Sequence, residues 1–502
     1  MSPTLSDPTL SRLAHSVLWP GFSGLEPPQW LLTALDCGLA GAVYFEQNLD
    51  PTNPPQARRL SARIHDANPA ALIGVDEEGG IVTRLEARTG SSTPGNAVLG
   101  RIDDPALTER TAAWIGALVA SAGIDIDLAP TVDVNSNPRN PVIGVRSFGA
   151  DPDLVARHAG AYVRGLQSAG VAACPKHFPG HGDTATDSHL DTATADITLD
   201  ELYAIHLPPF RAAIDAGAKA LMTAHIRVPA LGEAPATLNA KSLAIARESG
   251  FDGVLITDAV DMAAIRRTVG MGRGAVEALR AGADLICIGN PGSNSPNATA
   301  RTDEAEFLES LHAVYAALRS GELPTDRVEE AAARNAALAA WRRTQPTEPV
   351  LTDLPDGAEL AERAAELVGD VRLVNGSITV IDARTKRSIA VGDAPDFFTL
   401  ALREVRPADR VALGGLSDIE ARARVREALA TRPDNAVLVV NQPQASTIEA
   451  TVLTAVLEAR PDTIVIWAGW PADAATAATR RVMTFGASRA TALHAARALT
   501  SR

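Results

Sequence analysis

Short apolar segments recur along the first two thirds of the chain, and each is followed by a longer helix-compatible stretch. Eight segments of this kind are present, at residues 16–22, 41–45, 71–76, 124–134, 171–177, 218–225, 253–258 and 283–289. The stretches between them, such as residues 105–122 and 152–169, are rich in Ala, Leu and Arg. This alternation predicts parallel strands joined by crossover helices. A doubly wound open sheet would show the same alternation, but the count of eight and the polar clusters after several strands favour a (β/α)8 barrel.

The pattern changes after residues 304–343, which are the last helical stretch of this region. Residues 344–349 are polar and contain prolines, which is typical of a linker. Alternation then resumes with fewer strand candidates, at residues 377–381, 388–391, 410–414, 436–441 and 463–467. The sequence therefore predicts a catalytic (β/α)8 TIM-like barrel over residues 1–343, a linker over 344–353 and a smaller α/β sandwich domain over 354–502.

Composition narrows the class of protein without identifying a function. The chain has 502 residues, 46% hydrophobic and 21% charged, which indicates a globular protein of more than one domain. Its formal net charge of −14 disfavours a nucleic-acid partner, because phosphates would be repelled. The N-terminus has no basic region followed by an apolar one, and no apolar run reaches the roughly 20 residues of a membrane span, so a cytoplasmic protein without a membrane partner is expected. Cys37, Cys174 and Cys287 lie in or beside apolar runs, which predicts buried free thiols.

The densest group of ionisable residues follows the fifth predicted strand. Residues 176–184 read KHFPGHGDT, and residues 187–189 read DSH. Gly180 and Gly182 permit unusual backbone angles, so we expect a loop that presents side chains into a cleft. In a barrel, this loop lies at the carboxyl ends of the strands, where active sites are built.

Three interpretations of this loop are open from the residues alone. His177, His181 and His189 could be ligands of a metal ion in a barrel hydrolase. Asp187 and His189 could instead form a dyad, because Asp-x-His spacing places both side chains on one side of an extended segment, where the carboxylate can polarise the imidazole for proton transfer. The third interpretation is a solvated loop with surface histidines, which the density of ionisable groups disfavours.

Further polar residues follow three other predicted strands. Asp258 comes at the end of the seventh strand, where it could carry chemistry or, with Asp261 three residues later, cap the next helix. After the third strand, VDEEGG contains Asp76 and paired glycines, with Arg84 beyond, and this is typical of a tight ligand-binding loop or of an acidic turn. The long loop after the fourth strand contains Arg146, whose guanidinium could bind ligand hydroxyls or form a surface salt bridge.

Taken together, these segments resemble bacterial β-N-acetylglucosaminidases of glycoside hydrolase family 3, of the two-domain type. The signature loop of that family reads KHFPGHGDT followed by DSH, as residues 176–189 do here. The segments VDEEGG, NPRNPVIGVRSFG, MTAHIRVPAL with PATL, and ITDAVDM agree with the family in order and spacing, so the resemblance covers the whole barrel. The chain departs from it at Ile81, where many members carry Arg, and at Asn239, where Ser often follows PATL; these departures concern fine specificity.

The resemblance implies a role for eight residues. Asp258 would be the catalytic nucleophile, His189 the general acid/base and Asp187 the residue that orients it. The residues that would hold hydroxyls of the terminal N-acetylglucosamine are Asp76, Arg84, Arg146, Lys176 and His177. No metal and no cofactor is expected.

The activity so implied is retaining exo-cleavage of terminal N-acetylglucosamine from peptidoglycan- or chitin-derived fragments, through a covalent glycosyl-enzyme. A cytoplasmic location favours imported muropeptides or chito-oligosaccharides, as in peptidoglycan recycling. Phosphorolysis is the alternative, since a neutral histidine repels phosphate less than a carboxylate would. A metal-dependent barrel hydrolase using His177, His181 and His189 is a further alternative. A non-catalytic sugar-binding protein is disfavoured, because it would have no use for a nucleophile at Asp258.

Overall fold

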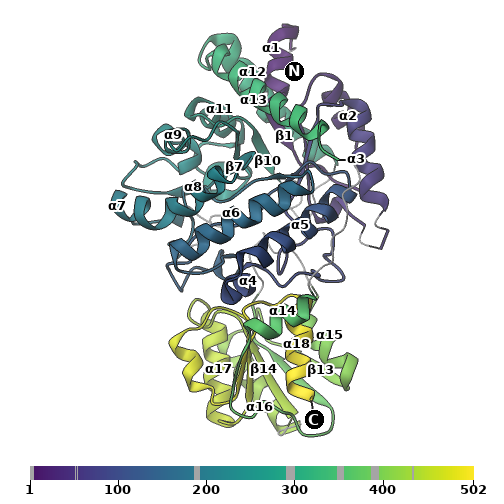
Figure 1. The fold of residues 1–502 in the computed structure, drawn as a ribbon, viewed down its shortest axis with the longest axis vertical. Coiled ribbons are helices and arrows are strands. Elements are labelled where there is room, and N and C mark those ends of the chain that lie inside the picture. The colour runs from purple at the N-terminus through teal and green to yellow at the C-terminus, as the bar shows by residue number, and fades with distance from the viewer. Residues whose placement is uncertain are drawn as a thin grey trace. The chain divides into compact units, whose positions relative to one another are not determined.

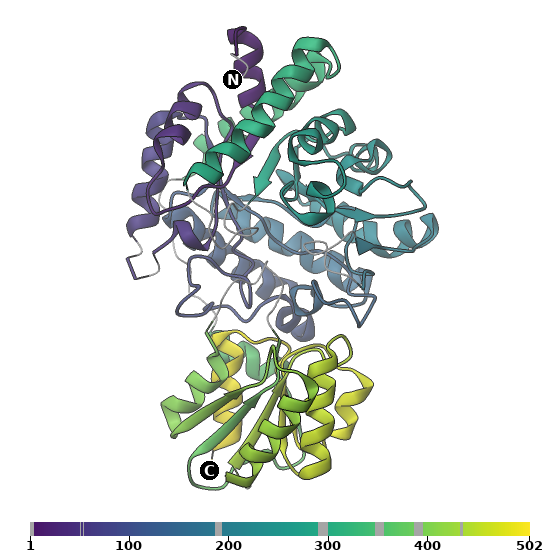
Figure 2. The same cartoon turned by 180° about the vertical axis from the view of Figure 1, so that it is seen from behind.

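The computed structural model describes residues 5–50, 52–53, 55–185, 193–289, 300–346, 356–385, 395–431 and 435–501. The chain divides into two compact units (Figure 1 and Figure 2). The first unit comprises Met1–Glu78, Pro105–Val134 and Asp151–Asp353, and the second comprises Gly79–Asp104, Asn135–Ala150 and Leu354–Arg502. The second unit therefore includes two segments from the first 150 residues. The domains predicted above are continuous ranges of the chain, and their bounds stay a prediction.

Eight strands of the first unit close into a ring. They are β1 (Leu18–Pro20), β2 (Gly41–Tyr44), β3 (Leu72–Val75), β4 (Ile126–Asp127), β5 (Ala172–Ala173), β7 (Ala220–Thr223), β9 (Val254–Thr257) and β10 (Ile286–Gly289), one in each predicted segment. Strands β2 to β5 form one parallel sheet, β7 pairs with β9, and β1 pairs with β10. Parallel bridges join Phe178 beyond β5 to Thr223, and Ile256 to Leu285, while β1 lies against β2. Because the last strand returns to the first, the structure is a (β/α)8 barrel, as predicted, and not an open sheet.

Helices connect these strands where the sequence predicted them. The helices of the first unit are α1 (Pro8–His15), α2 (Gln29–Asp36), α3 (Pro55–Ala67), α5 (Pro105–Ser121), α6 (Pro152–Ser168), α7 (Leu199–Glu201), α8 (Leu207–Asp215), α9 (Ala240–Glu248), α10 (Ala263–Arg266), α11 (Met271–Ala281), α12 (Ala300–Ser320) and α13 (Thr325–Arg343). Asp151 caps α6 by accepting from two backbone N–H groups, and Pro152 follows it at the first helical position, which fixes where this helix begins. Two short strands, β6 (Ala193–Thr194) and β8 (Ile226–Arg227), pair outside the ring. Over the part of the chain described, no helix combines the length and apolarity needed to cross a bilayer.

The barrel core draws one or more buried side chains from every strand. It includes Trp19, Val43, Leu72, Ile126, Ala172, Met222, Ile256 and Cys287, together with Leu338 and Ala339 of α13. Gly74 of β3 leaves room for Trp19, since a Cβ there would lie 2.2 Å from the indole. Cys174 and Cys287 are buried free thiols, as predicted, but Cys37 is exposed because it directly follows the end of α2.

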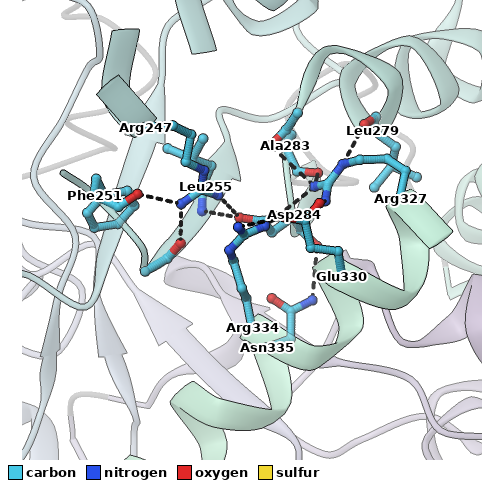
Figure 3. A network of polar contacts seen from close by, with 12 residues as sticks. Arg247, Phe251, Leu255, Leu279, Ala283, Asp284, Arg327, Glu330, Arg334 and Asn335 are labelled. Carbon is cyan, nitrogen blue, oxygen red and sulfur yellow. Dashed lines mark hydrogen bonds and ion pairs between the residues drawn. The ribbon is translucent and has the colours of Figure 1, made fainter. Parts of the chain in front are cut away.

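Asp284, two residues before β10, fastens α13 to the barrel (Figure 3). Its carboxylate is fully buried, and its Oδ1 lies 2.6 Å from Arg327 and 3.2 Å from Arg334, both on α13. The other oxygen pairs with Arg247 of α9 and accepts the N–H of Leu255 in β9 at 2.9 Å. One carboxylate therefore joins two helices and a strand, and its charge is compensated on every side.

The second unit contains a six-stranded sheet with the order β13–β12–β14–β15–β16–β11. Its strands are β11 (Glu366–Val368), β12 (Ile378–Asp382), β13 (Ala408–Ala412), β14 (Ala436–Val440), β15 (Ile464–Trp467) and β16 (Arg481–Met483). All are parallel except β11, which pairs antiparallel with β16 at the edge. Four predicted strands correspond to β12, β13, β14 and β15, and the candidate at 388–391 lies outside the described residues. The sequence did not predict β11 and β16.

Two groups of helices pack in this unit, which is the α/β sandwich expected. Helices α14 (Gly357–Ala364) and α15 (Phe397–Val405) each contact α18 (Arg489–Thr500), and α16 (Asp418–Thr431) contacts α17 (Thr447–Ala459). Helix α4 (Asn96–Ile102), from an early segment of the chain, packs on α14. Ile81, the departure from the family pattern, packs against the apolar core of this unit.

Candidate functional site

Two loops at the carboxyl ends of the barrel strands meet through a buried lysine. Lys176 follows β5, while Asp76 and Glu78 follow β3. Nζ of Lys176 lies 2.7 Å from Oδ1 of Asp76 and 2.7 Å from Oε1 of Glu78, and only 2% of the lysine side chain is exposed. A buried ammonium needs compensating charge, so the two carboxylates fix its position. Asp76 keeps 18% of its side chain exposed, which leaves one end of this ion pair open to a ligand.

A buried carboxyl group, Asp127 at the end of β4, lies beside this lysine and was not predicted from the sequence. Its Oδ1 accepts the N–H of Glu77 at 2.9 Å. Burial raises the pKa of Asp127 well above its ordinary value, and the charges of Glu77 and Asp76 add to this, while the Glu77 N–H and Lys176 oppose it. Burial thus favours the protonated form of Asp127 over the charged one.

Asp133 holds the histidine loop at two points. Its fully buried carboxylate lies 2.8 Å from Nδ1 of His177 and accepts the backbone N–H of His181 at 2.6 Å. Since a carboxylate can only accept, Nδ1 of His177 carries a proton. Burial is the largest influence on Asp133 and opposes its ionisation, but His177 and His181 together lower the pKa of Asp133 below its ordinary value. The charged carboxylate of Asp133 thus fixes the orientation of the His177 imidazole and the position of its proton.

His181 is buried behind this pair and is expected to make stability depend on pH. Burial is the main cause that lowers its pKa from 6.5 to about 4, with His177 adding to it and Asp133 and Asp258 opposing it. The unfolded chain then binds a proton more readily than the folded one, so the contribution to stability is complete above pH 6.5 and is lost as the pH falls towards 4. This shift corresponds to roughly 3 kcal/mol of unfolding free energy, measurable by urea unfolding at a series of pH values.

The matched variant for this measurement is His181→Asn. Its amide can replace the contact that Nδ1 of His181 makes with Oγ1 of Thr184, at 2.8 Å, without titrating. Its unfolding free energy should change less between pH 6.5 and 4 than that of the wild type. Parallel curves for the two proteins would contradict the assignment to His181.

Asp258 follows β9 on the same face of the barrel. Its N–H donates to Thr223 of β7 at 3.2 Å, and its Oδ1 accepts the N–H of Ala259 at 2.8 Å. The carboxylate is half-buried. Helix α10 has Met262 as its N-cap, so Asp258 does not cap that helix and the capping interpretation is wrong. Because Asp76, Lys176 and Asp258 all influence the pKa of buried Cys174, their charges act on one region of the barrel.

The two predicted arginines belong to the second unit. Arg84 and Arg146 are 5% and 4% exposed, so neither is a surface residue. The backbone carbonyl of Arg146 accepts from Nδ2 of Asn96 at 2.7 Å. The guanidinium Nη1 of Arg146 donates to the carbonyl of Val142 at 3.3 Å. Burial of this kind excludes the surface salt bridge that was an alternative for Arg146.

Asp187 and His189 lie outside the described residues. Their dyad, and the metal site that would need His189, therefore stay predictions. Within the described ranges, no group of three or more His, Cys, Asp or Glu side chains is arranged to hold a metal ion.

Comparison with protein families gives a match over most of the barrel. Residues 33–338 match the model of the glycosyl hydrolase family 3 N-terminal domain. Beta-hexosaminidase A of Pseudoalteromonas piscicida is 33% identical over 336 residues, which is 62% of this chain but only 55% of that protein. A beta-hexosaminidase of Stenotrophomonas maltophilia is 40% identical over 263 residues, or 50% of this chain and 77% of that protein.

A solved structure is similar over both units. It is a glycoside hydrolase family 3 beta-N-acetylglucosaminidase from Paenibacillus sp. str. FPU-7, with a TM-score of 0.85 and 31% identity. The match covers 98% of this chain and 96% of that one. The similarity therefore extends beyond the barrel into the second unit.

Proposed function

Because this chain belongs to glycosyl hydrolase family 3, we propose that it is a retaining exo-β-N-acetylglucosaminidase. It would release terminal N-acetylglucosamine from peptidoglycan- or chitin-derived fragments. The coarser assignment, a glycoside hydrolase of the β-hexosaminidase type, rests on the family match and on relatives that carry this name. The observation that carries the proposal is the anchoring of Lys176 and His177 by Asp76 and Asp133 on the face where Asp258 lies.

The described residues suit the recognition of a neutral sugar. The carboxylate of Asp76 can accept from sugar hydroxyls, and the ammonium of Lys176 can donate to them. Because Nδ1 of His177 donates to Asp133, the imidazole is held in one orientation with its proton on Nδ1. Paired charges that already bind one another need little rearrangement when a hydroxyl joins them.

In the proposed mechanism, the carboxylate of Asp258 attacks the anomeric carbon while the glycosidic oxygen takes a proton from His189. The bond to the leaving group breaks, and a covalent glycosyl-enzyme forms. His189, now neutral and oriented by Asp187, removes a proton from the acceptor, which attacks the same carbon and displaces Asp258. Two inversions give net retention of configuration.

Hydrolysis of p-nitrophenyl N-acetyl-β-glucosaminide is the test of this function. We expect release of p-nitrophenol, at least 100-fold less turnover of the corresponding β-glucoside, which lacks the N-acetyl group, and no effect of a chelator. Equal turnover of the two substrates would contradict the proposed specificity. Loss of activity on chelation would favour the metal-dependent alternative.

Product analysis on defined disaccharides separates the remaining possibilities. We expect N-acetylglucosamine as the product in both phosphate and non-phosphate buffer. N-acetylglucosamine 1-phosphate, formed only with phosphate, would make phosphorolysis the reaction. Turnover of a muropeptide-derived disaccharide compared with chitobiose identifies the leaving sugar.

A further inference from the structure

The segment Asn135–Ala150, which contains Arg146, is packed within the second unit. We propose that Trp470 and Gln442 of this unit are positioning residues, which hold the Arg146 segment in the conformation that binds the sugar. The inference rests on the proposed function, because that function assigns Arg146 to sugar binding.

The segment is shaped partly by its own hydrogen bonds. The N–H of Asn135 donates to the carbonyl of Gly149 at 2.9 Å and closes its base. The side chain of Asn140 accepts the N–H groups of Val142 and Ile143, each at 2.9 Å, and forms a turn. These bonds leave several backbone carbonyls of the segment to be bound by other residues.

Side chains from the carboxyl ends of β14 and β15 bind those carbonyls. Nε1 of Trp470 donates to the carbonyl of Gly144 at 2.7 Å. Nε2 of Gln442 donates to the carbonyl of Asn140 at 3.1 Å. A third donor, Nε2 of Gln444, reaches the carbonyl of Pro138 at 3.1 Å. The contacts thus cover the stretch that leads directly into Arg146.

The donors are themselves fixed by the second unit. The N–H of Gln442 donates to Glu449 of α17 at 2.9 Å, and Glu449 is buried. The carbonyl of Trp470 accepts from Nε1 of Trp467 at 2.9 Å, and its ring packs edge-on against Phe485 with centroids 5.9 Å apart. A donor held in this way imposes its position on the acceptor rather than following it.

Gly144 lies very close to the side chain of Gln442. Its φ is +46°, and a Cβ there would lie 2.5 Å from Nε2 of Gln442. Glycine adopts this backbone angle without strain, and a side chain here would displace the amide of Gln442. On the other side of Arg146, Asn96 binds its carbonyl at 2.7 Å, so both flanks of the residue are held.

Because the segment is already ordered before the substrate binds, binding does not have to supply the entropy cost of ordering it. Loss of one of these hydrogen bonds should therefore weaken sugar binding through Arg146 and leave the chemistry at Asp258 unchanged. The expected signature is a rise in KM with little change in kcat, because the ground state and the transition state lose the same contact.

The test uses Trp470→Phe and Gln442→Met in the full-length chain, with p-nitrophenyl N-acetyl-β-glucosaminide. Each variant keeps the bulk of the side chain and removes the donor. We expect KM to rise about 3- to 10-fold, the equivalent of one hydrogen bond, with kcat within about twofold. Arg146→Ala should raise KM more, and the double variant Arg146→Ala with Trp470→Phe should show no further rise, because the tryptophan acts through the arginine.

Matched controls come from the first unit. Trp30→Phe removes the N–H of an indole ring that stacks on Phe307, and Gln345→Met removes an amide that donates to the carbonyl of Trp341 at 3.2 Å; both should leave KM unchanged. A rise in KM for Arg146→Ala but none for Trp470→Phe and Gln442→Met, or additive effects in the double variant, would overturn the inference. An unchanged KM for Arg146→Ala would instead overturn its assignment in the proposed function. Thermal unfolding of each variant distinguishes these outcomes from loss of folding.

Discussion

Replacement of Asp258 by alanine is expected to lower kcat by about 10⁴-fold or more. Without the carboxylate, no covalent glycosyl-enzyme can form, and the loss corresponds to a barrier increase of about 5 kcal/mol. The sugar-binding group formed by Asp76, Lys176 and His177 is untouched, so KM should change far less than kcat. Steady-state kinetics with p-nitrophenyl N-acetyl-β-glucosaminide measures both quantities.

Azide provides an independent check on the role of Asp258. In the alanine variant, the anion can occupy the space of the lost carboxylate and attack from the same face, which would restore release of p-nitrophenol and give the α-glycosyl azide. Asp252→Ala, at an exposed position before the same strand, is the control and should retain wild-type kcat. If Asp258→Ala kept more than about one hundredth of wild-type kcat, Asp258 would not be the nucleophile.

Replacement of Asp284 by alanine is expected to lower the free energy of unfolding by about 3–5 kcal/mol. The variant would leave Arg247, Arg327 and Arg334 together around a position that no longer carries a negative charge, and the N–H of Leu255 without its acceptor. The substitution removes the carboxylate of a buried ionic network, while the arginines still carry the free-energy cost of desolvation. Urea unfolding at neutral pH measures the loss as a lower midpoint.

Asp284→Asn is the informative companion to this variant. It can still accept the N–H of Leu255 but has no charge for the three arginines, so we expect an intermediate loss of stability. Asp252→Ala serves again as the exposed control and should change the unfolding free energy by less than about 0.5 kcal/mol. A change as small for Asp284→Ala would show that α13 is held by apolar packing and not by this carboxylate.

The sequence predicted the barrel well because its strands are buried on both sides. Each of the eight appears as a short apolar run, and each is followed by a helix long enough to show its own pattern. The strands β11 and β16 escaped prediction, because each has only three residues and includes a charged one, Glu366 or Arg481. The second unit could not be recognised as discontinuous either, because the packing of Gly79–Asp104 and Asn135–Ala150 leaves no pattern along the chain.

In the candidate site, too, some residues could be predicted from the sequence pattern and others only from the packing. Asp76, Lys176, His177 and Asp258 were predicted because loops at strand ends carry ionisable residues in recognisable segments. Asp127 and Asp133 were not, since both lie within the largely apolar stretch 124–134 and bind partners that lie 50 and 44 positions away in the sequence. The sequence signal that could have identified these two residues is a carboxylate inside an apolar stretch, because an unpaired buried charge costs free energy.

The discontinuous second unit also bears on how this protein is made. Residues 79–104 and 135–150 leave the ribosome long before residue 354, where the remainder of their unit begins. At synthesis rates of about 5–20 residues per second, the earlier segment waits at least ten seconds for its partners. The barrel helices can form during this interval, but these two stretches of the nascent chain cannot pack with residues 354–502 until those residues have been made.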